Sequence, residues 1–487
     1  MQVPSSPQAR SDGGTLLATP AAEPNPRSAA RAGGARKHRL RALEDALVSL
    51  SKRADIAQVE ALMAGQGLVE HNMTTLLLNL RKRQKWRIAV LIADWHARGD
   101  CPFQLTTKQR NILLSSCARR SPRATLELFS RMLASGAETN AVTHNTAMAA
   151  ALALDDVDYA LELFAGMRPR GIEPTTISYN SAITACARGA GYEPEYAERA
   201  LALFREMEAN GVERTTVTYT GLIQACAEGV QLDKAMALFT YMDVAGVDRN
   251  PVTYCVAING CTRNGQWELG LQLLQEMGRK GVRPDAHVFN AAISACEKGG
   301  QWDKALRLLS QMREMGCRPT AVTYGAAISA CEKGRQWERA LALLSEMGEE
   351  RSRACKPNTI AYSAAISACG NAGQWEAALG LFQQMEARSI PRNTISYNAA
   401  IQACADGGAW QHALTLFDRM ASEGVARDRH TYNTIVRSLE GSGEAKLALD
   451  VRMEGAAALR QEEEGEGGAP QERRGGGGGG RAGGVGR

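Results

Sequence analysis

The sequence lacks the short motifs that mark catalytic and metal centres. It contains no Cys-x-x-Cys pair and no Gly-x-x-x-x-Gly-Lys-Ser/Thr loop, so it indicates neither a zinc site nor a phosphate-cradling loop. It also lacks the His-x-Glu and Pro-Cys-x-x-Cys elements with which zinc deaminases activate water. Residues 1–37 hold no apolar run long enough for a secretory signal or a membrane span. We therefore expect no metal, no cofactor, no membrane contact and no enzyme activity.

The excess of charge is small. The formal net charge is +5 and the pI is near 8.6. A mildly basic surface permits an anionic partner but does not require one, because many protein-binding chains carry the same charge. Charge alone therefore leaves a nucleic-acid partner and a protein partner open.

The sequence does contain a long internal repeat. The stretch FNAAISACEKGGQWDKALRLLSQM at 289–312 returns almost unchanged as YGAAISACEKGRQWERALALLSEM at 324–347, and the register from Ala286 to Ala321 is 35 residues. Self-similarity at a fixed period of this length indicates stacked helix pairs. A chain of 487 residues would ordinarily suggest about three domains. We expect one α-solenoid instead, because the core of a repeat array grows along one axis.

The residues of one repeat predict two helices. Ala292, Ile293 and Cys296 recur three and four residues apart, so they share one face of a first helix, which ends at the glycine pair 299–300. A second helix starts near Trp302 and carries apolar residues at helical spacing. A pair this small cannot bury its apolar face alone and must stack on its neighbours. The expected result is an all-α solenoid with one continuous core and one long concave face.

Nine repeats keep this register, and less regular segments flank them. We expect a disordered leader at 1–37, which resembles an organellar transit peptide or is a leader without an address. Degenerate repeats or N-terminal capping helices follow at 38–106, a partial C-terminal capping repeat lies at 429–456, and a disordered Gly/Arg-rich tail lies at 457–487. The nine clear repeats are 107–140, 141–175, 176–215, 216–250, 251–285, 286–320, 321–358, 359–393 and 394–428.

Cysteines recur late in the first helix of these repeats. Separation by a whole repeat argues against a disulfide framework and favours small buried hydrophobic residues in a reducing compartment. Methionines within the second helix and tryptophans at its start recur in step and also predict core rather than a site. The recurring cysteines are Cys117, Cys186, Cys226, Cys261, Cys296, Cys331, Cys369 and Cys404.

The repeats resemble the pentatricopeptide repeat family. The likeness lies in TISYNSAITACARG at 176–189, VTYGAAISACEKGRQWERALALLSEM at 322–347 and TISYNAAIQACADGG at 394–408, and it covers about 107–428 clearly and about 70–456 in all. The W-x₂-L-G-x₂-Y pattern of the tetratricopeptide repeat is absent. The resemblance implies a right-handed superhelical α-solenoid that binds single-stranded RNA, one base per repeat.

The resemblance also implies which residues read the bases. They are the fifth and the last residue of each repeat, counted from its first residue. A short amide, hydroxyl or carboxylate there can hydrogen-bond the edge of an unpaired base. The implied pairs are Asn111 with Asn140, Asn145 with Thr175, Asn180 with Thr215, Thr220 with Asn250, Cys255 with Asp285, Asn290 with Thr320, Gly325 with Asn358, Ser363 with Asn393, and Asn398 with Asp428, while Asn433 opens an incomplete last repeat.

The pairing preferences of the family imply a partial RNA target. The Thr/Asn and Ser/Asn pairs favour adenine, the Asn/Asp pair at 398 and 428 favours uracil, and the other Asn pairs favour pyrimidines. Cys255 and Gly325 depart from the pattern, so their repeats are left without an assigned base. The implied site, 5′ to 3′, is Y-Y-Y-A-n-Y-n-A-U.

Two further sets of residues accompany these pairs. The second residue of each repeat is implied to sandwich a base, whereas the residues alone favour packing at a helix start. Basic residues near the end of the first helix fit phosphate contacts, or a solvated helix end that favours cations. The sandwiching set is Val142, Ile177, Val217, Val252, His287, Val322, Ile360, Ile395 and His430, and the phosphate set is Arg119, Arg188, Arg263, Lys298 and Lys333.

The resemblance implies a protein of organellar RNA metabolism, in a mitochondrion or chloroplast, that acts in transcript stabilisation, processing, splicing or translation. Some relatives carry a catalytic domain after the array, but the low-complexity residues after the last repeat here are too few for one. We expect a monomer that binds single-stranded RNA, with protein partners in an RNA-processing complex as a further option. The alternative is a protein-scaffolding solenoid of tetratricopeptide type. Asn, Thr, Ser and Asp at both reading positions favour RNA, since a scaffold would have no reason to keep them.

Overall fold

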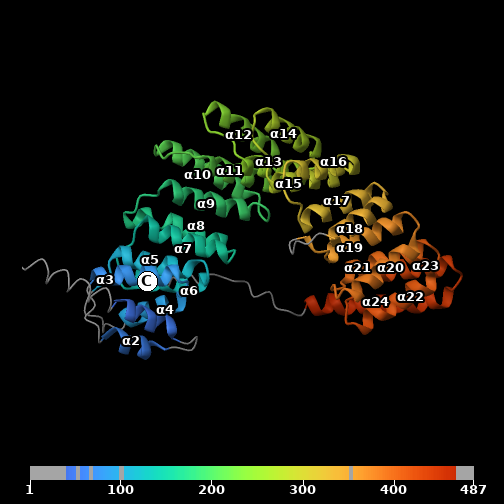
Figure 1. Cartoon of the computed structure of the whole chain (residues 1–487), viewed down its shortest axis with the longest axis horizontal. Coiled ribbons are helices and arrows are strands. Elements are labelled where there is room, and N and C mark those ends of the chain that lie inside the picture. Colours follow the sequence, from blue (N-terminus) through green and yellow to red (C-terminus); the bar gives the residue numbers. More distant parts are fainter. Residues whose placement is uncertain (1–39, 51–54, 65–69, 98–103, 350–354, 468–487) are drawn as a thin grey trace, which may run out of the picture. The chain divides into compact units, whose positions relative to one another are not determined.

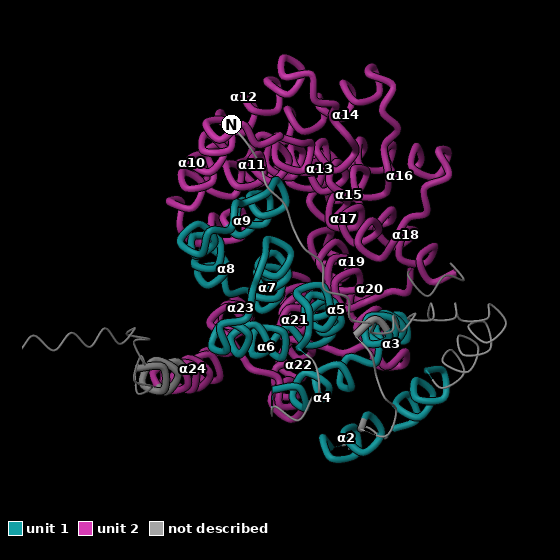
Figure 2. The backbone as a smooth tube through the Cα atoms, turned by 90° about the vertical axis from the view of Figure 1, so that its left-hand side faces the viewer, with its two compact units in different colours: residues 1–185 teal, residues 186–487 magenta. Residues whose placement is uncertain are grey.

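The computed structural model describes residues 40–50, 55–64, 70–97, 104–349 and 355–467. The chain divides into two compact units, residues 1–185 and 186–487, which Figure 2 colours separately. In the described residues every regular element is a helix. The expected all-α solenoid class is therefore confirmed. The leader at 1–37 and the tail from 468 onward lie outside the described residues.

The first compact unit consists of stacked helix pairs. Here α3 contacts α5 and α5 contacts α7, so the first helices of successive pairs lie against each other. Residues 40–49 are also helical. The remaining elements are α2 (Ile56–Ala64), α3 (Glu70–Lys82), α4 (Trp86–Ala97), α5 (Thr107–Ala118), α6 (Pro122–Ala134), α7 (Ala141–Ala153), α8 (Val157–Ala165), the short 3₁₀ helix η1 (Arg168–Arg170) and the larger part of α9 (Thr176–Gly189).

The second compact unit repeats this arrangement, and Figure 1 shows its pairs following one another in chain order. Odd-numbered helices from α11 to α23 contact one another in sequence, and each even-numbered helix from α12 to α22 contacts the odd-numbered helix on either side. The helices are α10 (Glu195–Ala209), α11 (Thr216–Glu228), α12 (Leu232–Val244), α13 (Pro251–Arg263), α14 (Trp267–Arg279), α15 (Ala286–Lys298), α16 (Trp302–Glu314), α17 (Ala321–Lys333), α18 (Trp337–Glu349), α19 (Thr359–Asn371), α20 (Trp375–Ala387), α21 (Thr394–Asp406), α22 (Trp410–Ser422), α23 (Arg429–Gly441) and α24 (Ala445–Gly467).

In several repeats an aromatic residue at the fourth position joins a helix pair to the pair before it. Tyr397 is fully buried, and its ring meets the ring of Phe382 edge-on, with centroids 4.8 Å apart. Tyr254 meets Phe239 in the same way at 5.3 Å. Edge-to-face aromatic pairs stabilise by about 0.5–1.5 kcal/mol beyond the area they bury. Because the phenylalanine belongs to the preceding second helix, this contact holds one repeat against the next.

The series of residues expected in the core is buried. All eight recurring cysteines are 0% exposed, and burial raises the pKa of the Cys296, Cys331 and Cys404 thiols to about 11. The prediction that they are core residues is confirmed. The recurring tryptophans are half-buried, and Trp267, Trp302 and Trp375 lie against the glycine that ends the next first helix. A Cβ at Gly299, for example, would come within 2.4 Å of Trp267.

The last helix differs from the expectation. Residues 457–467, assigned from sequence to a disordered tail, belong to α24, which runs to Gly467. The segment preceding the glycines is rich in Ala, Leu, Arg, Gln and Glu, which are strong helix formers, so the helix continues beyond its packed part. Among the described helices, none combines the length and apolar character that crossing a lipid bilayer requires.

The turn at Val230 gives a test of the repeat geometry. Val230 stands where the repeat at 286–320 has Gly300, and both are left-handed, with φ of 60° and 65°. The following backbone N–H closes the same turn, from Gln231 to the Cys226 carbonyl oxygen at 2.8 Å. A β-branched residue is strained in this conformation, and the side chain is 77% exposed.

We therefore predict that Val230→Gly raises the free energy of unfolding by about 1 kcal/mol, measured by urea denaturation. The matched control, Gly300→Val, should lower it by a similar amount. A destabilised Val230→Gly variant would show that the valine side chain makes a contact that outweighs the strain.

Candidate functional site

The last residue of each clear repeat caps the first helix of the next repeat. The Asp285 carboxylate accepts the Val288 backbone N–H at 2.9 Å, and the Asn250 side chain accepts that of Thr253 at 2.9 Å. Asn, Asp and Thr are favoured at this position because their side chains satisfy an unpaired N–H of the first turn. The residues that cap in this way are Asn140, Thr175, Asn250, Asp285, Asn358, Asn393 and Asp428, while Thr215 and Thr320 hold the same position within capping boxes.

This capping corrects one argument from the sequence. A scaffold would also keep Asn, Asp or Thr at the last position, because the following helix needs its cap. The polar character of the last residue therefore does not distinguish an RNA-binding array from a protein-binding one. The fifth residue is not a cap, so its composition keeps its weight.

The fifth residues lie beside these caps. The Asn111 side-chain amide donates to Asn140 Oδ1 at 3.1 Å, and the Asn398 amide donates to both carboxylate oxygens of Asp428 at 3.1 Å. In these two repeats the structure brings the two expected reading residues together. Asn111, Asn145, Asn180, Thr220, Cys255, Asn290 and Asn398 are half-buried, Gly325 and Ser363 are buried, and Asn433 is exposed.

The Asp428 carboxyl is held in its charged form. Burial acts to raise the pKa of Asp428, but hydrogen bonds from the Thr431 backbone N–H, the Thr431 hydroxyl and the Asn398 amide outweigh it, and the pKa lies below its ordinary value. At neutral pH this position is therefore a hydrogen-bond acceptor only.

A third residue, which the sequence analysis missed, touches both reading residues. The Thr431 hydroxyl lies 2.6 Å from Asn398 Oδ1 and 2.8 Å from Asp428 Oδ1, so these two acceptors share its one hydrogen. Thr143 donates in the same way to Asn111 Oδ1 at 2.7 Å. These hydroxyl-bearing residues hold the third position of the repeat and are fully buried. A Ser or Thr three residues after a cap resembles a capping box, which was the available signal.

The second residues of the repeats are exposed. Packing at the helix start, the reading that the residues alone favoured, is therefore wrong. His287 and His430 are exposed as well. The exposed fractions of the apolar members are 57% for Val142, 66% for Ile177, 61% for Val217, 57% for Val252, 67% for Val322, 67% for Ile360 and 66% for Ile395. Single exposed apolar residues are ordinary, but recurrence at one position of successive repeats makes a row within each compact unit, which a ligand can cover.

The basic residues near the ends of the first helices are exposed, and some carry partners. Arg263 forms an ion pair with Glu228, and Lys333 forms one with Glu297 at 3.0 Å. Exposed ion pairs of this kind contribute only about 0–1 kcal/mol. A phosphate can therefore compete for these cations, while Lys298 in the last turn of α15 and Arg119 after α5 are exposed as well.

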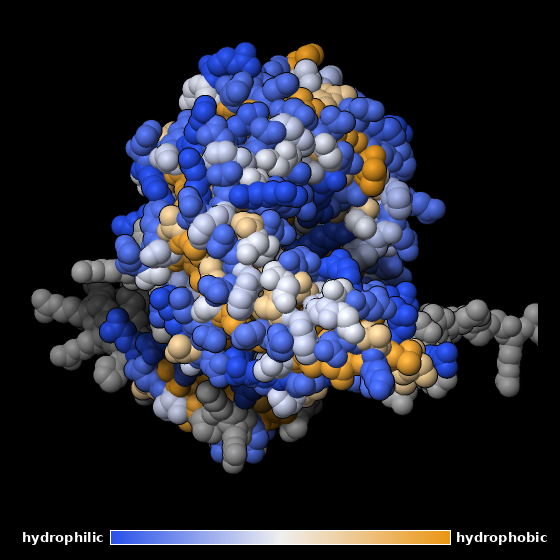
Figure 3. Space-filling view, turned by 90° about the vertical axis from the view of Figure 1, so that its right-hand side faces the viewer, coloured by the Kyte–Doolittle hydropathy of each residue, from blue (hydrophilic) through white to orange (hydrophobic). Residues whose placement is uncertain are grey.

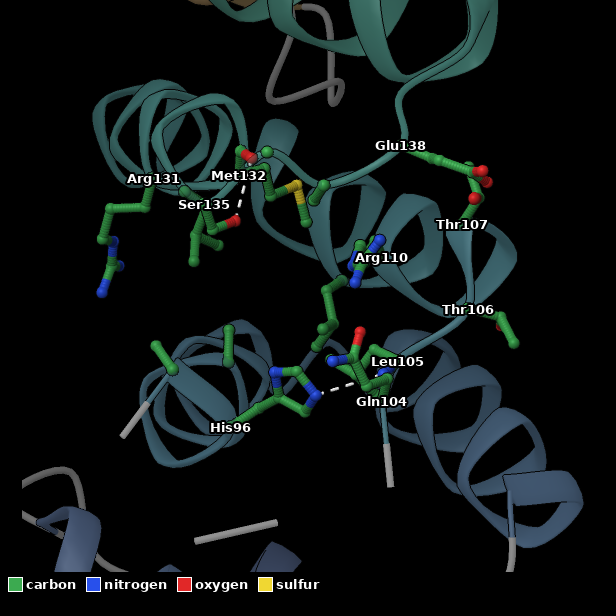
Figure 4. Close-up of a pocket in the computed structure, with 16 residues that line it drawn as sticks. His96, Gln104, Leu105, Thr106, Thr107, Arg110, Arg131, Met132, Ser135 and Glu138 are labelled. Carbon is green, nitrogen blue, oxygen red and sulfur yellow. Dashed lines mark hydrogen bonds between the residues drawn. The ribbon is translucent and has the colours of Figure 1, made fainter. Parts of the chain in front are cut away.

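A hollow between α4, α5 and α6 lies apart from the row, and Figure 4 shows His96 and Arg110 beside it. Ala93, His96 and Arg110 hold the positions at which Phe239, Met242 and Tyr254 stand in the later pair α12 and α13. The smaller alanine leaves about 640 Å³ open. Of the expected site residues, none lines this hollow. We attribute it to irregular packing between the first helix pairs.

Figure 3 shows one side of the surface, on which hydrophobic residues are scattered among hydrophilic ones. On that face they do not form one broad apolar area of the kind that large protein interfaces bury.

Comparison with known families agrees with the repeat register. A model of the pentatricopeptide repeat domain matches residues 127–188, 202–264 and 272–335. A model of the PPR repeat family matches 357–406 and 392–440, and one of the PPR repeat matches 252–282 and 322–352. No curated protein sequence matches the chain significantly.

Solved structures share the fold. The pentatricopeptide repeat protein PPR10 in complex with an 18-nt psaJ RNA element is similar, with a TM-score of 0.69 and 18% identity. A cysteine-to-serine variant of that protein, also bound to the RNA element, gives the same values. The similarity covers 89% of this chain and 62% of that one, so this chain spans less than two thirds of PPR10. PPR10 from maize is also similar, with 19% identity, coverage of 90% and 86%, and a TM-score of 0.38.

Measurements of stability can distinguish a residue that caps a helix from one that only contacts a base. We predict that Asp428→Ala lowers the free energy of unfolding by about 1 kcal/mol, because the first turn of α23 loses its cap. Asn398→Ala should change it by less than about 0.5 kcal/mol, since its amide caps nothing. Urea denaturation of both variants measures this difference. An Asn398→Ala variant that loses as much stability as Asp428→Ala would mean that the fifth residue is structural.

Proposed function

The chain belongs to the pentatricopeptide repeat family, and from this premise we propose that it binds single-stranded RNA sequence-specifically, one base per repeat. One observation carries the proposal: exposed Val and Ile residues recur at the second position, next to hydrogen-bonding groups at the fifth and last positions. Apolar groups suit the faces of bases, and the polar groups suit their edges. The RNA bound by PPR10, a protein of the same fold, supports the proposal.

The chemistry of one repeat illustrates the reading. Asp428 is an acceptor at neutral pH, and uracil presents an N3–H donor that cytosine lacks. The Asn398 amide beside it offers N–H groups to a carbonyl oxygen of the base. The pair therefore favours uracil. Applied to all repeats, the pairing preferences give the target Y-Y-Y-A-n-Y-n-A-U, 5′ to 3′.

Affinity without sequence information would come from the basic residues at the ends of the first helices. Neutralising phosphates releases counterions, so binding weakens as salt rises, with a slope of about −0.7 per phosphate for a single strand. Lys298 and Arg119 are exposed for this role, and Arg188, Arg263 and Lys333 occupy the same place in their repeats. These contacts hold the strand while the fifth and last residues select the bases.

The biological role that fits is occupancy of a transcript. A bound array covers a single-stranded stretch, blocks nucleases or pairing, or exposes a neighbouring site. We propose action in organellar RNA metabolism, in a mitochondrion or chloroplast, through stabilisation, processing, splicing or translation. The leader at 1–37, with its transit-peptide composition, supports an organellar address. We propose a monomer that does no chemistry itself and works alone or beside RNA-processing proteins.

The exposed row gives one test of this function. We predict that Ile395→Ala weakens binding of a 5′-fluorescent RNA containing the target by about tenfold, roughly 1.4 kcal/mol, measured by anisotropy at near-physiological salt. Val244→Ala is the matched control: Val244 is 80% exposed but lies at the end of a second helix, so binding should stay unchanged. Equal RNA binding by both variants would contradict the role of the row and favour the protein-scaffold alternative.

A second test separates reading from phosphate contact. Asn398→Ala should remove the preference for uracil at one position and leave the other positions unchanged. Lys298→Ala should weaken all RNAs equally and make the salt slope shallower by about 0.7. Binding to a panel of RNAs with single-base changes, at several salt concentrations, measures both. A uniform loss across the panel for Asn398→Ala would contradict base reading by the fifth residue.

A further inference from the structure

We propose that a threonine hydroxyl at the third position of a repeat positions the fifth residue of the preceding repeat, and that repeats 251–285 and 321–358, which have no amide or hydroxyl at either place, select no base. The inference rests on the proposed RNA reading and adds a residue that determines its specificity. It follows from a hydrogen bond that spans two repeats and from the joint absence of both of its members in two places.

The hydrogen bond recurs through the array. Thr323 donates to Asn290 Oδ1 at 2.6 Å, as Thr431 does to Asn398. The hydroxyls of Thr220 and Thr253 lie 2.9 Å apart. Each bond joins the fifth residue of one repeat to the third of the next, and each third-position side chain is fully buried.

The same junction precedes the nine clear repeats. Gln109, at the third position, donates to the Thr74 hydroxyl at 3.1 Å and forms a capping box with Thr106. Thr74 and Thr106 stand at the fifth and last positions of the degenerate repeat at 70–106. The pair does not stand out in the sequence, because this repeat departs from the pattern elsewhere. Its place at the junction makes it a further candidate for base reading.

The bond fixes which face the Asn290 amide presents. The backbone N–H of Thr320 donates to the Thr323 oxygen at 2.9 Å, which directs the hydroxyl hydrogen toward Asn290 Oδ1. An amide whose oxygen is engaged in this way must turn its NH₂ group elsewhere. Asn290 thus offers a donor, which suits the O2 carbonyl shared by uracil and cytosine.

Two repeats lack both members of the bond. Cys255 at a fifth position is followed by Val288 at the third position of the next repeat, and Gly325 is followed by Ala361. Neither Val288 nor Ala361 carries a hydroxyl, although the two changes lie far apart in sequence. The hydrogen-bonding group of the fifth residue and that of the next third residue are absent together, which indicates that the two act together.

Helix capping does not account for this coincidence. Asp285 still accepts the Val288 backbone N–H at 2.9 Å, and Asn358 accepts that of Ala361 at 3.0 Å. These helices are capped without a third-position hydroxyl. The hydroxyl is therefore dispensable for the cap, and its presence follows the identity of the fifth residue instead.

Serine at the third position behaves differently from threonine. Ser396 donates to the carbonyl oxygen of its own cap, Asn393, at 2.8 Å, and Ser178 lies 3.1 Å from the hydroxyl of Thr175. The fifth residues before them, Ser363 and Asn145, each keep a buried oxygen without a hydrogen-bond partner. Thr143, Thr253, Thr323 and Thr431 contact the fifth residue of the preceding repeat, whereas these two serines bond at their own helix start.

Removal of one hydroxyl tests the proposal in the full chain. Thr323→Val keeps the side-chain shape and frees the Asn290 amide, so the pyrimidine preference at that base should fall about fivefold. Thr431→Val is the matched control: Asp428 still holds the Asn398 amide, so the uracil preference should change less than about twofold. A role in capping alone would affect both variants alike, and thermal unfolding shows whether each variant folds.

Restoring the device gives the complementary test. In an Asp285→Thr background, which copies the Thr320 cap and removes the carboxylate that could hold the amide, Cys255→Asn alone should gain little preference. Cys255→Asn with Val288→Thr in that background should gain a pyrimidine preference of about fivefold at a base that the array otherwise ignores. Equal preference in the single and double variants, or an unchanged preference in Thr323→Val, would overturn the positioning role and leave RNA reading intact. If the unmodified chain prefers no base at any position, the proposed function and this inference both fall.

Discussion

Each repeat depends on its successor for the burial of its apolar surface. A pair of thirteen-residue helices such as α15 and α16 cannot exclude water alone. The first helices therefore lie against each other, and the aromatic residue at the fourth position is driven into the preceding second helix. This requirement sets the register at every junction. It also places the fifth residue of one repeat, the third of the next and the cap between them within hydrogen-bonding distance.

The junction combines stability with selection, and the two make different demands. The last residue must cap a helix, so its repertoire is limited to short polar side chains such as Asn250, Asp285 and Thr320. The fifth residue lies within a first helix and carries no such duty. It accordingly varies more widely, down to Cys255 and Gly325. Base preference can therefore change through the fifth residue without loss of the fold. Each repeat stays stable whether or not it recognises a base.

Much of the fold follows from sequence, because period and composition determine it. The helix starts near Ala286 and Trp302, the buried cysteines and the glycines that end first helices are all as expected. The extent of α24 was not expected, because the glycine-rich residues that follow it hide the helix-forming segment before them. The candidate site was harder to predict from the sequence. Exposure of Ile395 depends on where a helix face meets its neighbour, which periodicity at a helix start does not resolve.

The third-position threonines and the caps were missed for a related reason. A Thr near a helix start satisfies local rules by itself, so sequence gives no cause to connect Thr323 with a residue of the previous repeat. Likewise, the polar character of Asp428 has two sufficient explanations, a cap and a reader, and only the geometry shows that one side chain faces both partners. When one residue has both a structural and a binding role, its type in the sequence does not tell the two roles apart.

The most direct test of the account is unbiased selection of bound RNA from a random single-stranded pool, with the full chain at near-physiological salt. The account predicts an enriched window in which A, an unselected base, a pyrimidine, an unselected base, A and U follow one another 5′ to 3′. Salt matters, because any basic surface binds nucleic acid when salt is low. Absence of an enriched window, with binding that vanishes as salt rises, would contradict base reading and leave a solenoid whose exposed row meets a protein instead.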